Sequence, residues 1–459
     1  MLLFLAAALN LQASAQAENS GSEPGTLSLQ EAISYAIEHN VQVKNQRLEI
    51  AISDAQVKEV LAQGYPQANV NGNLTYNAVV PTSFLPAQIF NPDAPADTYA
   101  PVQFGVPHQG NIALSVNQLI FNGSFFVGLQ ASKTVKELTQ KNVEKAETDV
   151  AENVSTAYFG ALIAQERLKL LQNNTARLDS LLRDTQVMYD NGFVELIDVQ
   201  RIKVNRNNVR TQYQNVERAY AININMLKFL VGMPIENNLR LTESLNDFVL
   251  ESKASAQYAY SDRVEYQQLQ INRELALLDV KNNRIQYYPT VNAFFNYGYN
   301  AGQPTFSGLF QESEDFQDVD GNIQEVSTWN NYSSVGLNVN IPIFDGFLKA
   351  NRIRRAKLVV EQTENFIRNT ENQIDMEVQQ ARINLENSRQ NLQIQKENME
   401  LAQEVFRISK IKYQEGVGSN LEVIEAENAY VTAENQYYEA LYNALVAKVQ
   451  HQKATGNLR

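Results

Sequence analysis

Four segments of the chain alternate between apolar and polar residues. They cover residues 68–77, 111–121, 290–300 and 333–343. In the third segment, Val291, Phe295 and Tyr297 fall on one face, and Asn292 and Asn296 fall on the other. A period of two predicts a β-strand, so we expect four strands that each have an apolar and a polar face. None of the four segments contains a charged residue.

The rest of the chain carries apolar residues at helical spacing. Pro66 and Pro289 end a helix before a strand, because proline disfavours the helical conformation in the residue that precedes it. Gly192 and Gly416 predict tight turns between a very long helix and a returning one. Each of the two longest helices would measure roughly 95–100 Å and carry a coiled-coil-like apolar stripe. The predicted helices cover residues 29–63, 124–188, 196–230, 263–286, 347–412 and 421–449.

The chain also repeats itself. Tyr65-Pro66 recurs as Tyr288-Pro289, and Phe121-Asn122-Gly123 recurs as Phe344-Asp345-Gly346, both at an offset of 223 residues. Past these points Gly192 matches Gly416 at an offset of 224. Two tandem copies of one unit are therefore expected, each with a helix, a two-strand hairpin and a long helical hairpin.

These patterns divide the chain into the following predicted segments. They are a signal peptide (1–17), a helical segment (18–67), a β-hairpin with an external loop (68–122), a long helical hairpin (123–231), an equatorial linker (232–262), a second helical segment (263–289), a second β-hairpin with an external loop (290–345) and a second long helical hairpin (346–459).

Composition narrows the classes of function. A net charge of −13 argues against a nucleic-acid partner, because phosphate binding needs clustered Lys and Arg. The absence of Cys excludes disulfides and thiolate metal sites. The three His are far apart in sequence, and no Gly-rich phosphate loop follows a strand. We therefore expect no cofactor and no bound metal, and we find no nucleophile and base for an enzyme.

Two environments explain the strands. A soluble, half-buried sheet alternates in the same way as a membrane sheet with a wet lumen, although the long unbroken helices favour the membrane. In lipid, a four-stranded sheet must close with other copies, because lipid offers its two edges no hydrogen-bond partner. Two chains would give eight strands and a filled interior, whereas three would give twelve and room for a channel.

Taken together, the chain resembles the TolC family of outer-membrane efflux proteins. The opening residues 27–40, the junction Ile343-Phe344-Asp345-Gly346 and the turns around Gly192 and Gly416 are similar to family motifs. The resemblance implies a homotrimer with a twelve-stranded barrel in the outer membrane lipid of a Gram-negative bacterium. It also implies a helical tunnel across the periplasm, a membrane-fusion adaptor and an inner-membrane pump of the RND or ABC type.

The same resemblance implies site residues at the periplasmic tips of the helices. Family members ring the aperture with acids six and nine residues after the second turn glycine, which here are Glu422 and Glu425. Their latch joins an Asp, a Tyr and an Arg. Asp198 and Tyr413 match, but Gly418 occupies the Arg position, so either the link is missing or Arg201 supplies it. The turns with Gly192, Gly416 and Gly418 correspond to the adaptor-docking tips.

The expected function is therefore that of a passive outer-membrane channel, which exports small molecules (drugs, detergents, metals) or secreted proteins. The sequence does not separate these cargoes, because the pump selects them. The alternative is a periplasmic coiled-coil scaffold or adaptor with its strands in a soluble domain. Adaptors usually have a single helical hairpin and do not need four uncharged amphipathic strands.

Overall fold

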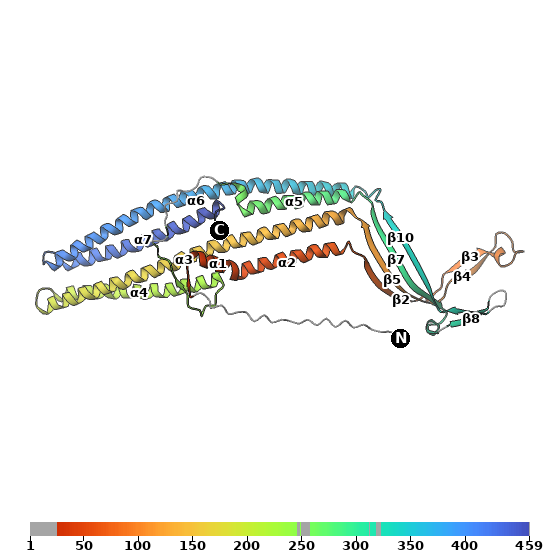
Figure 1. Cartoon of the computed structure of the whole chain (residues 1–459), viewed down its shortest axis with the longest axis horizontal. Coiled ribbons are helices and arrows are strands. Elements are labelled where there is room, and N and C mark those ends of the chain that lie inside the picture. The colour runs from red at the N-terminus through yellow and green to blue at the C-terminus, as the bar shows by residue number, and fades with distance from the viewer. Residues whose placement is uncertain (1–24, 246–247, 249–257, 312, 318–322, 459) are drawn as a thin grey trace. The chain divides into compact units, whose positions relative to one another are not determined.

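The computed structural model describes residues 25–245, 248, 258–311, 313–317 and 323–458 (Figure 1). The predicted signal peptide, at 1–17, lies outside the described residues, as do residues 249–257 of the predicted linker. The chain divides into two compact units. Unit 1 comprises Met1–Asn45, Val143–Val264 and Asn372–Arg459, and unit 2 comprises Gln46–Asn142 and Glu265–Glu371.

Unit 2 contains a four-stranded antiparallel sheet in the order β10-β7-β5-β2. The strands are β2 (Gln67–Tyr76), β5 (His108–Phe121), β7 (Thr290–Gln303) and β10 (Trp329–Asn340). Each repeat supplies two neighbouring strands, and the two repeats join through β5 and β7 (Figure 1). All four predicted strands are therefore present in one sheet, with β2 and β10 at its edges.

The register places the apolar residues of all four strands on one face. Ala68 pairs with Val116, Val116 pairs with Phe295, and Phe295 pairs with Val335. The other face carries polar pairs such as Asn69 with Ser115. Because paired residues in a sheet point to the same side, the predicted division into an apolar and a polar face is confirmed.

Two details of the strands differ from the prediction. The register of β5 and β7 shifts between Leu119 and Phe121, so Ile120 is an extra residue at a β-bulge and Phe121 pairs with Val291. Simple alternation does not reveal such an insertion. The strand predicted for 333–343 ends at Asn340, directly before Ile341 and Pro342. Proline has no N–H to donate to the ladder, and it favours the end of a strand.

Two smaller hairpins lie between the main strands. The first consists of β3 (Thr82–Pro86) and β4 (Tyr99–Gln103), and the second consists of β8 (Ser313–Gln317) and β9 (Ile323–Ser327). Both fall in segments that the sequence analysis assigned to external loops.

Helices that precede and follow these strands along the chain complete unit 2. They are α2 (Val41–Ala62), α5 (Val264–Ile285) and the first parts of α3 (Gly123–Asp190) and α6 (Leu348–Gln414). Lys136 of α3 lies 2.8 Å from Asp54 of α2 and, with Lys58, lowers the pKa of that carboxyl to about 2. Arg273 of α5 lies 2.9 Å from Glu364 of α6. Within the described residues, no helix is both long enough and apolar enough to cross a membrane.

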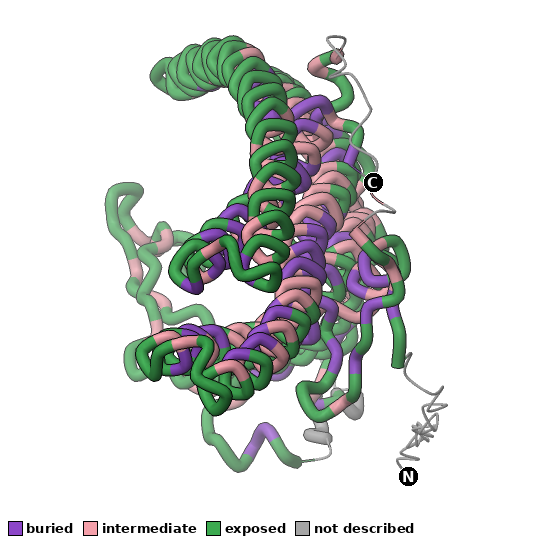
Figure 2. Tube along the Cα trace, turned by 90° about the vertical axis from the view of Figure 1, so that its left-hand side faces the viewer, coloured by how far each residue is buried: buried purple, intermediate pink, exposed green. Residues whose placement is uncertain are grey.

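Unit 1 holds the remaining parts of α3 and α6 together with α1 (Leu29–His39), α4 (Leu196–Val231) and α7 (Asn420–Ala454). Figure 2 shows the buried positions as stripes along the helices, with exposed positions on their other sides. The largest apolar cluster centres on Tyr158, Leu162, Leu227 and Leu445, each at most 1% exposed. Beside it, β1 (Thr26–Leu27) pairs in parallel with β6 (Arg240–Leu241), which lies in the predicted linker.

The single helix predicted for 29–63 is wrong, because the chain leaves the helical conformation at Asn40. Asn40 has extended backbone angles and separates α1 from α2. Its Nδ2 donates to the carbonyl of Leu230 at 2.7 Å, and its Oδ1 accepts from the N–H of Gln42 at 2.8 Å. The side chain thus caps the new helix and ties it to the end of α4, as Asn often does at helix starts.

Candidate functional site: the tips of the helical hairpins

Both long hairpins turn through a left-handed glycine. Gly192 has φ +79°, and Gly416 has φ +75°. In the second turn, the N–H of Gly416 donates to the carbonyl of Tyr413 at 3.1 Å, and the N–H of Val417 donates to that of Lys412 at 3.0 Å. These bonds satisfy the carbonyls that the end of α6 leaves open. Glycine suits both positions because a Cβ disfavours positive φ.

Gly418 is needed for a different reason. A Cβ at this residue would lie 2.9 Å from the Cβ of Lys412 and 3.1 Å from the backbone nitrogen of Tyr413. Its N–H also donates to the carbonyl of Lys412 at 3.1 Å. The position that carries the latch Arg in the resemblance therefore packs against the end of α6 here. An Arg at this position would force the turn to move.

The candidate latch residues lie close together at the tips, with partners of their own. Asp198 lies 3.8 Å from Arg201, one helical turn further along α4. Its Oδ2 also accepts from the N–H of Glu195 at the start of the helix, and its backbone carbonyl accepts from Asn420 of α7 at 3.1 Å. The hydroxyl of Tyr413 pairs instead with that of Thr185 at 3.3 Å.

Asp198 and Tyr413 are linked through space rather than by a hydrogen bond. Burial raises the pKa of Tyr413, whose side chain is 6% exposed, while the bond to Thr185 opposes the rise and the charge of Asp198 adds to it. Tyr413 belongs to a small apolar cluster with Leu181, Ile202 and Val423. This cluster brings together all four helices of the two hairpins.

The two candidate aperture acids lie in the first turns of α7. Ser419 caps this helix, and its hydroxyl accepts from the N–H of Glu422 at 3.2 Å. Glu422 and Glu425 are both exposed, and neither forms an ion pair within the described chain. Val423, between them in sequence, is buried, so the turn packs through its apolar side and leaves both carboxylates in water.

Comparison with models of protein families identifies the family of this chain. The model of the outer membrane efflux proteins matches residues 32–233 and again residues 257–457, once for each repeat. The chain belongs to the outer membrane efflux protein family. Members of this family are transport conduits and not enzymes, so the chain is an efflux channel of the Gram-negative outer membrane that extends into the periplasm.

Solved structures show the same fold as this efflux protein. The open state of the MtrE outer membrane channel from Neisseria gonorrhoeae has a TM-score of 0.72 and 16% identity, over 94% of this chain and 89% of that one. CusC has a TM-score of 0.71 and 15% identity, over 93% of this chain and 92% of that one. The outer membrane protein VceC from Vibrio cholerae has a TM-score of 0.67 and 15% identity, over 93% of this chain and 96% of that one. A search of the curated proteins found no match to the sequence.

The efflux protein also has a buried polar cluster that the sequence analysis missed. Arg177 of α3 lies 3.4 Å from Glu427 of α7, and its guanidinium is 5.4 Å from the ring centre of Tyr430 and 5.7 Å from that of Phe406. Glu427 is 1% exposed. Burial raises the pKa of Glu427, and the charge of Arg177 opposes that rise. This cluster joins the first hairpin to both helices of the second.

A second acid extends the cluster. Asn174 accepts a hydrogen bond from Arg177 and donates to Glu434, 4% exposed, at 3.2 Å. Burial and the carboxylate of Glu434 raise the pKa of Tyr430. One signal in the sequence points to these acids. Val423, Glu427, Tyr430 and Glu434 are spaced four, three and four residues apart, so the acids fall on the buried stripe of α7.

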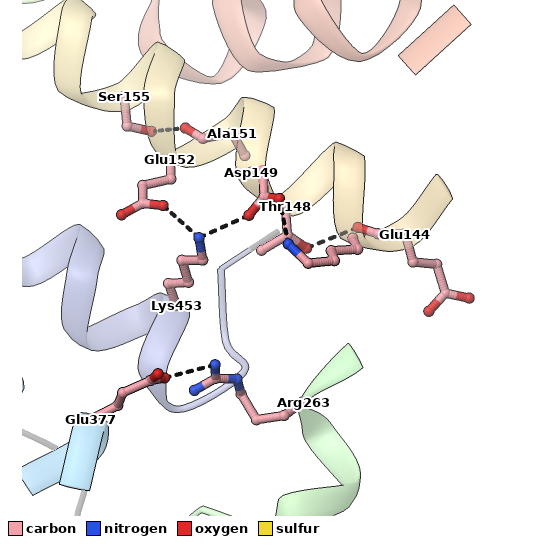
Figure 3. A network of polar contacts seen from close by, with 10 residues as sticks. Glu144, Thr148, Asp149, Ala151, Glu152, Ser155, Arg263, Glu377 and Lys453 are labelled. Carbon is pink, nitrogen blue, oxygen red and sulfur yellow. Dashed lines mark hydrogen bonds and ion pairs between the residues drawn. The ribbon is translucent and has the colours of Figure 1, made fainter. Parts of the chain in front are cut away.

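Ion pairs hold the other end of α7 (Figure 3). Lys453 lies 2.8 Å from Asp149 and 2.7 Å from Glu152, both on α3. Arg263 donates to Glu377 of α6 at 2.9 Å and to the carbonyl of Ala454 at 3.0 Å. We call the contacts among these six residues the α7 clamp. The clamp connects the last turn of the efflux protein's second repeat to α3 and α6.

Proposed function

We propose that three copies of the chain assemble into one passive export channel of the outer membrane. The observation that carries this proposal is the pair of free edges of the four-stranded sheet, at β2 and β10. Neither edge finds a partner in the described part of the chain. Within lipid, unpaired N–H and C=O groups cost several kcal/mol each, so the edges of one copy must pair with those of the next.

The number of strands supports three copies. Three chains with four strands each give twelve (3 × 4), enough to leave a water-filled interior. The apolar face, with side chains such as Val335 and Leu337 at 82% and 66% exposure in a single chain, would meet lipid. The Asn- and Ser-rich face would line the lumen. This is the polarity of outer-membrane sheets around an aqueous channel.

In this proposal the tips of α6 and α7 close the tunnel. Glu422 and Glu425 of each chain ring the aperture, where they attract cations. The apolar cluster around Tyr413, the pair Asp198–Arg201 and the Arg177–Glu427 pair hold the two hairpins together in the closed state. Opening requires the second hairpin to move against the first. The turns at Gly192, Gly416 and Gly418 are the surfaces that a periplasmic adaptor would contact.

The channel works with partners that supply energy and choose the cargo. A membrane-fusion adaptor and an inner-membrane pump of the RND or ABC type would deliver small molecules or secreted proteins to the tips. Likeness to MtrE, which is described as an outer membrane channel, supports the role of a conduit. A passive conduit needs no catalytic residue, and the chemistry found at the tips is that of packing and ion pairing.

Engineered disulfides test the closure directly, because the natural chain has no Cys. Asn71→Cys on β2 is combined in turn with Ser334→Cys, Gly336→Cys or Asn338→Cys on β10, which scans the unknown register between copies. We expect one of the combinations to give a covalent three-chain species on a denaturing gel. A largest species of two chains, or no linked species in any combination, refutes the proposed closure.

Ser115→Cys with Asn296→Cys is the matched control. These residues pair across β5 and β7 of the same chain, so their disulfide is internal and leaves single chains. Ionic current across a planar bilayer then tests the conduit. Discrete current steps from the linked trimer support a closed barrel. Silence that persists after the tips around Gly192 and Gly416 are cut back favours the periplasmic scaffold instead.

A further inference from the structure

The start of α6 is strongly basic although the chain as a whole is acidic. Between Gly346 and Val360 the sequence has five basic residues and no acid, against a net charge of −13 for the chain. The five are Lys349, Arg352, Arg354, Arg355 and Lys357. Lys349 already has partners within the chain. It forms an ion pair with Asp345 at 2.9 Å, and its Nζ lies 5.4 Å from the ring centre of Tyr287. The other four are exposed, and none of them pairs with an acid in the described chain.

The two repeats show that the fold does not require this charge. At the offset of 223 residues, the five basic positions of α6 correspond to uncharged positions of α3. The α3 residues are Phe126, Leu129, Ala131, Ser132 and Thr134. Both helices follow the last strand of their hairpin, α3 after one intervening residue and α6 after seven. Because the first repeat forms the same element with uncharged residues at these positions, folding does not require the cations of α6.

The cations also lie beside the aromatic residues that flank the sheet. Tyr288, Phe344 and Phe347 stand at the helix ends of the strands and are 61%, 76% and 66% exposed. Exposed aromatic side chains at strand ends are typical of the boundary between hydrocarbon and headgroups. Arg352 and Lys357 follow the first residue of α6 by about 6 and 14 Å along its axis. A headgroup layer is roughly 5–8 Å thick, within reach of Arg and Lys side chains.

The helical repeat sorts the four cations into two pairs. Glu364 and Glu371 contact Arg273 and Tyr266 of α5, which defines the side of α6 that faces α5. At 100° per residue, the midpoints of the pairs Arg352–Arg355 and Arg354–Lys357 lie about 160° apart, on opposite flanks of the helix. Lys357 falls near the α5-facing side, and Arg355 falls near the side opposite it. Leu358, 58% exposed, lies opposite α5, where a neighbouring copy would pack. In a one-helix-thick wall, one flank faces outward and the other faces the lumen.

We propose that the outward pair of cations on α6 binds the phosphate of an anionic phospholipid in the inner leaflet of the membrane. The inference rests on the proposed function, which places the sheet across that membrane. Two cations one helical turn apart match a phosphate that carries negative charge on several oxygens, and Arg binds such groups through parallel N–H donors. The contact anchors α6 at the level where the channel leaves the bilayer.

Lipid retention on the intact assembly tests this proposal. The full chain, in a neutral detergent, is mixed with equal amounts of phosphatidylglycerol and phosphatidylcholine, and retained lipids are counted by native mass spectrometry. We expect the natural chain to prefer phosphatidylglycerol by about tenfold. Either Arg352→Gln with Arg355→Gln or Arg354→Gln with Lys357→Gln should abolish the preference, and the other double variant should keep it.

The two double variants are controls for each other, because they remove equal charge from the same turns of one helix. Replacing the Arg residues of the sensitive pair with Lys should retain most of the preference, since the charge stays. No preference in the natural chain, an equal loss in both double variants, or no loss in either overturns the proposal. If the disulfide-linked trimer forms and conducts while phosphatidylglycerol is not preferred, only the lipid site fails and the proposed function stands.

Discussion

The carboxylate of Glu427 lies 3.4 Å from the guanidinium of Arg177, and the two residues come from different hairpins. Glu427 is 1% exposed, whereas the side chain of Arg177 keeps 31% of its surface in water. The pair therefore joins α3 to α7 through one fully buried charge. Removing a single partner from such a pair costs more than the pair itself contributes, because the remaining charge is left without compensation.

Arg177→Met should accordingly loosen α7, whereas Arg177→Met combined with Glu427→Gln should restore most of the loss. We expect the opening free energy of α7, measured by hydrogen exchange, to fall by roughly 1–3 kcal/mol in the single variant. Glu427→Gln alone should change it by less than about 1 kcal/mol. Equal effects of the single and double variants would show that Arg177 acts by packing on Tyr430 and Phe406, without help from Glu427.

The α7 clamp should make stability depend on pH at the acid end. Burial acts to raise the pKa of Asp149, but the bonds to Lys145 and Lys453 outweigh it and lower that pKa. A lowered pKa adds stability above the usual Asp value of about 3.9, and this stability is lost as the pH falls through the folded-state pKa. The same balance applies to Lys453. Burial acts to lower its pKa, but the bonds to Asp149 and Glu152 outweigh burial and raise it.

Lys453→Met tests the clamp because it keeps the aliphatic packing and removes the charge. At neutral pH we expect a loss of roughly 1–2 kcal/mol, seen as a lower thermal midpoint of the helical circular dichroism signal. The difference in thermal midpoint between the natural chain and the variant should shrink below about pH 4. As the pH falls further, Asp149 and Glu152 become protonated, so the natural chain loses its ion pairs as well. A difference that stays constant down to pH 2.5 would contradict an electrostatic clamp.

Four glycines with positive φ should differ in how far they tolerate Ala. A Cβ at Gly232 would lie 2.7 Å from the carbonyl oxygen of His39, and at Gly456 it would lie 2.7 Å from that of Asp262. Nothing lies within 4 Å of the corresponding position at Gly192 or Gly416. Ala at Gly192 or Gly416 should lower the free energy of unfolding by about 1–2 kcal/mol, from the strained φ alone. Ala at Gly232 or Gly456 should lower it by roughly 2–4 kcal/mol, because the Cβ also meets backbone atoms. Thermal midpoints of the four variants provide the comparison.

Neutralising the aperture acids should change ion selectivity. In the proposed trimer, Glu422→Ala with Glu425→Ala removes two charges per chain from the narrowest part of the lumen. We expect a lower cation preference and weaker block by multivalent cations in bilayer recordings. Glu397→Ala with Glu400→Ala, exposed acids further along α6, serves as the matched control and should leave selectivity nearly unchanged. Unchanged selectivity in the tip variant places these acids away from the aperture.

Neighbouring residues of β10 test which face of the sheet meets lipid. Leu337→Arg places a cation on the apolar face and should cost about 2–4 kcal/mol near mid-bilayer, which impairs assembly into membranes. Asn338→Arg places the same side chain on the polar face, where water solvates it, and should assemble normally. The measurement is the yield of the sodium dodecyl sulfate-resistant or disulfide-linked trimer from the membrane fraction. Equal yields would show that the apolar face does not contact lipid.

Much of the fold followed from local patterns. Alternation located the four strands, and the offset of 223 residues located the two repeats, because both signals repeat along the chain itself. The break at Asn40 and the bulge at Ile120 were missed. Asn40 is fixed by its bond to Leu230, far along the chain, and Ile120 by its misfit with β7. Neither partner can be recognised from residues nearby in sequence.

The candidate site divides in the same way. The resemblance assigned Glu422, Glu425, Asp198 and Tyr413 to the tips through motifs beside the turn glycines, and their aperture and latch roles stay predictions. The structure places Asp198 and Tyr413 near each other at the tips. The Arg177–Glu427 pair was not found, because a charged residue on a polar helix is usually solvated. Only the buried stripe of α7 distinguishes Glu427 from the exposed acids around it.

The sequence by itself determined the repeat, the two-faced strands, the turn glycines and the absence of charge from the strands, since each depends on residue type and spacing along the chain. Only the tertiary structure decided which strands are left at the edges and which charges are buried. It also showed that Gly418 has no room for a side chain. These properties depend on contacts between residues far apart in sequence, for which local periodicity carries no information.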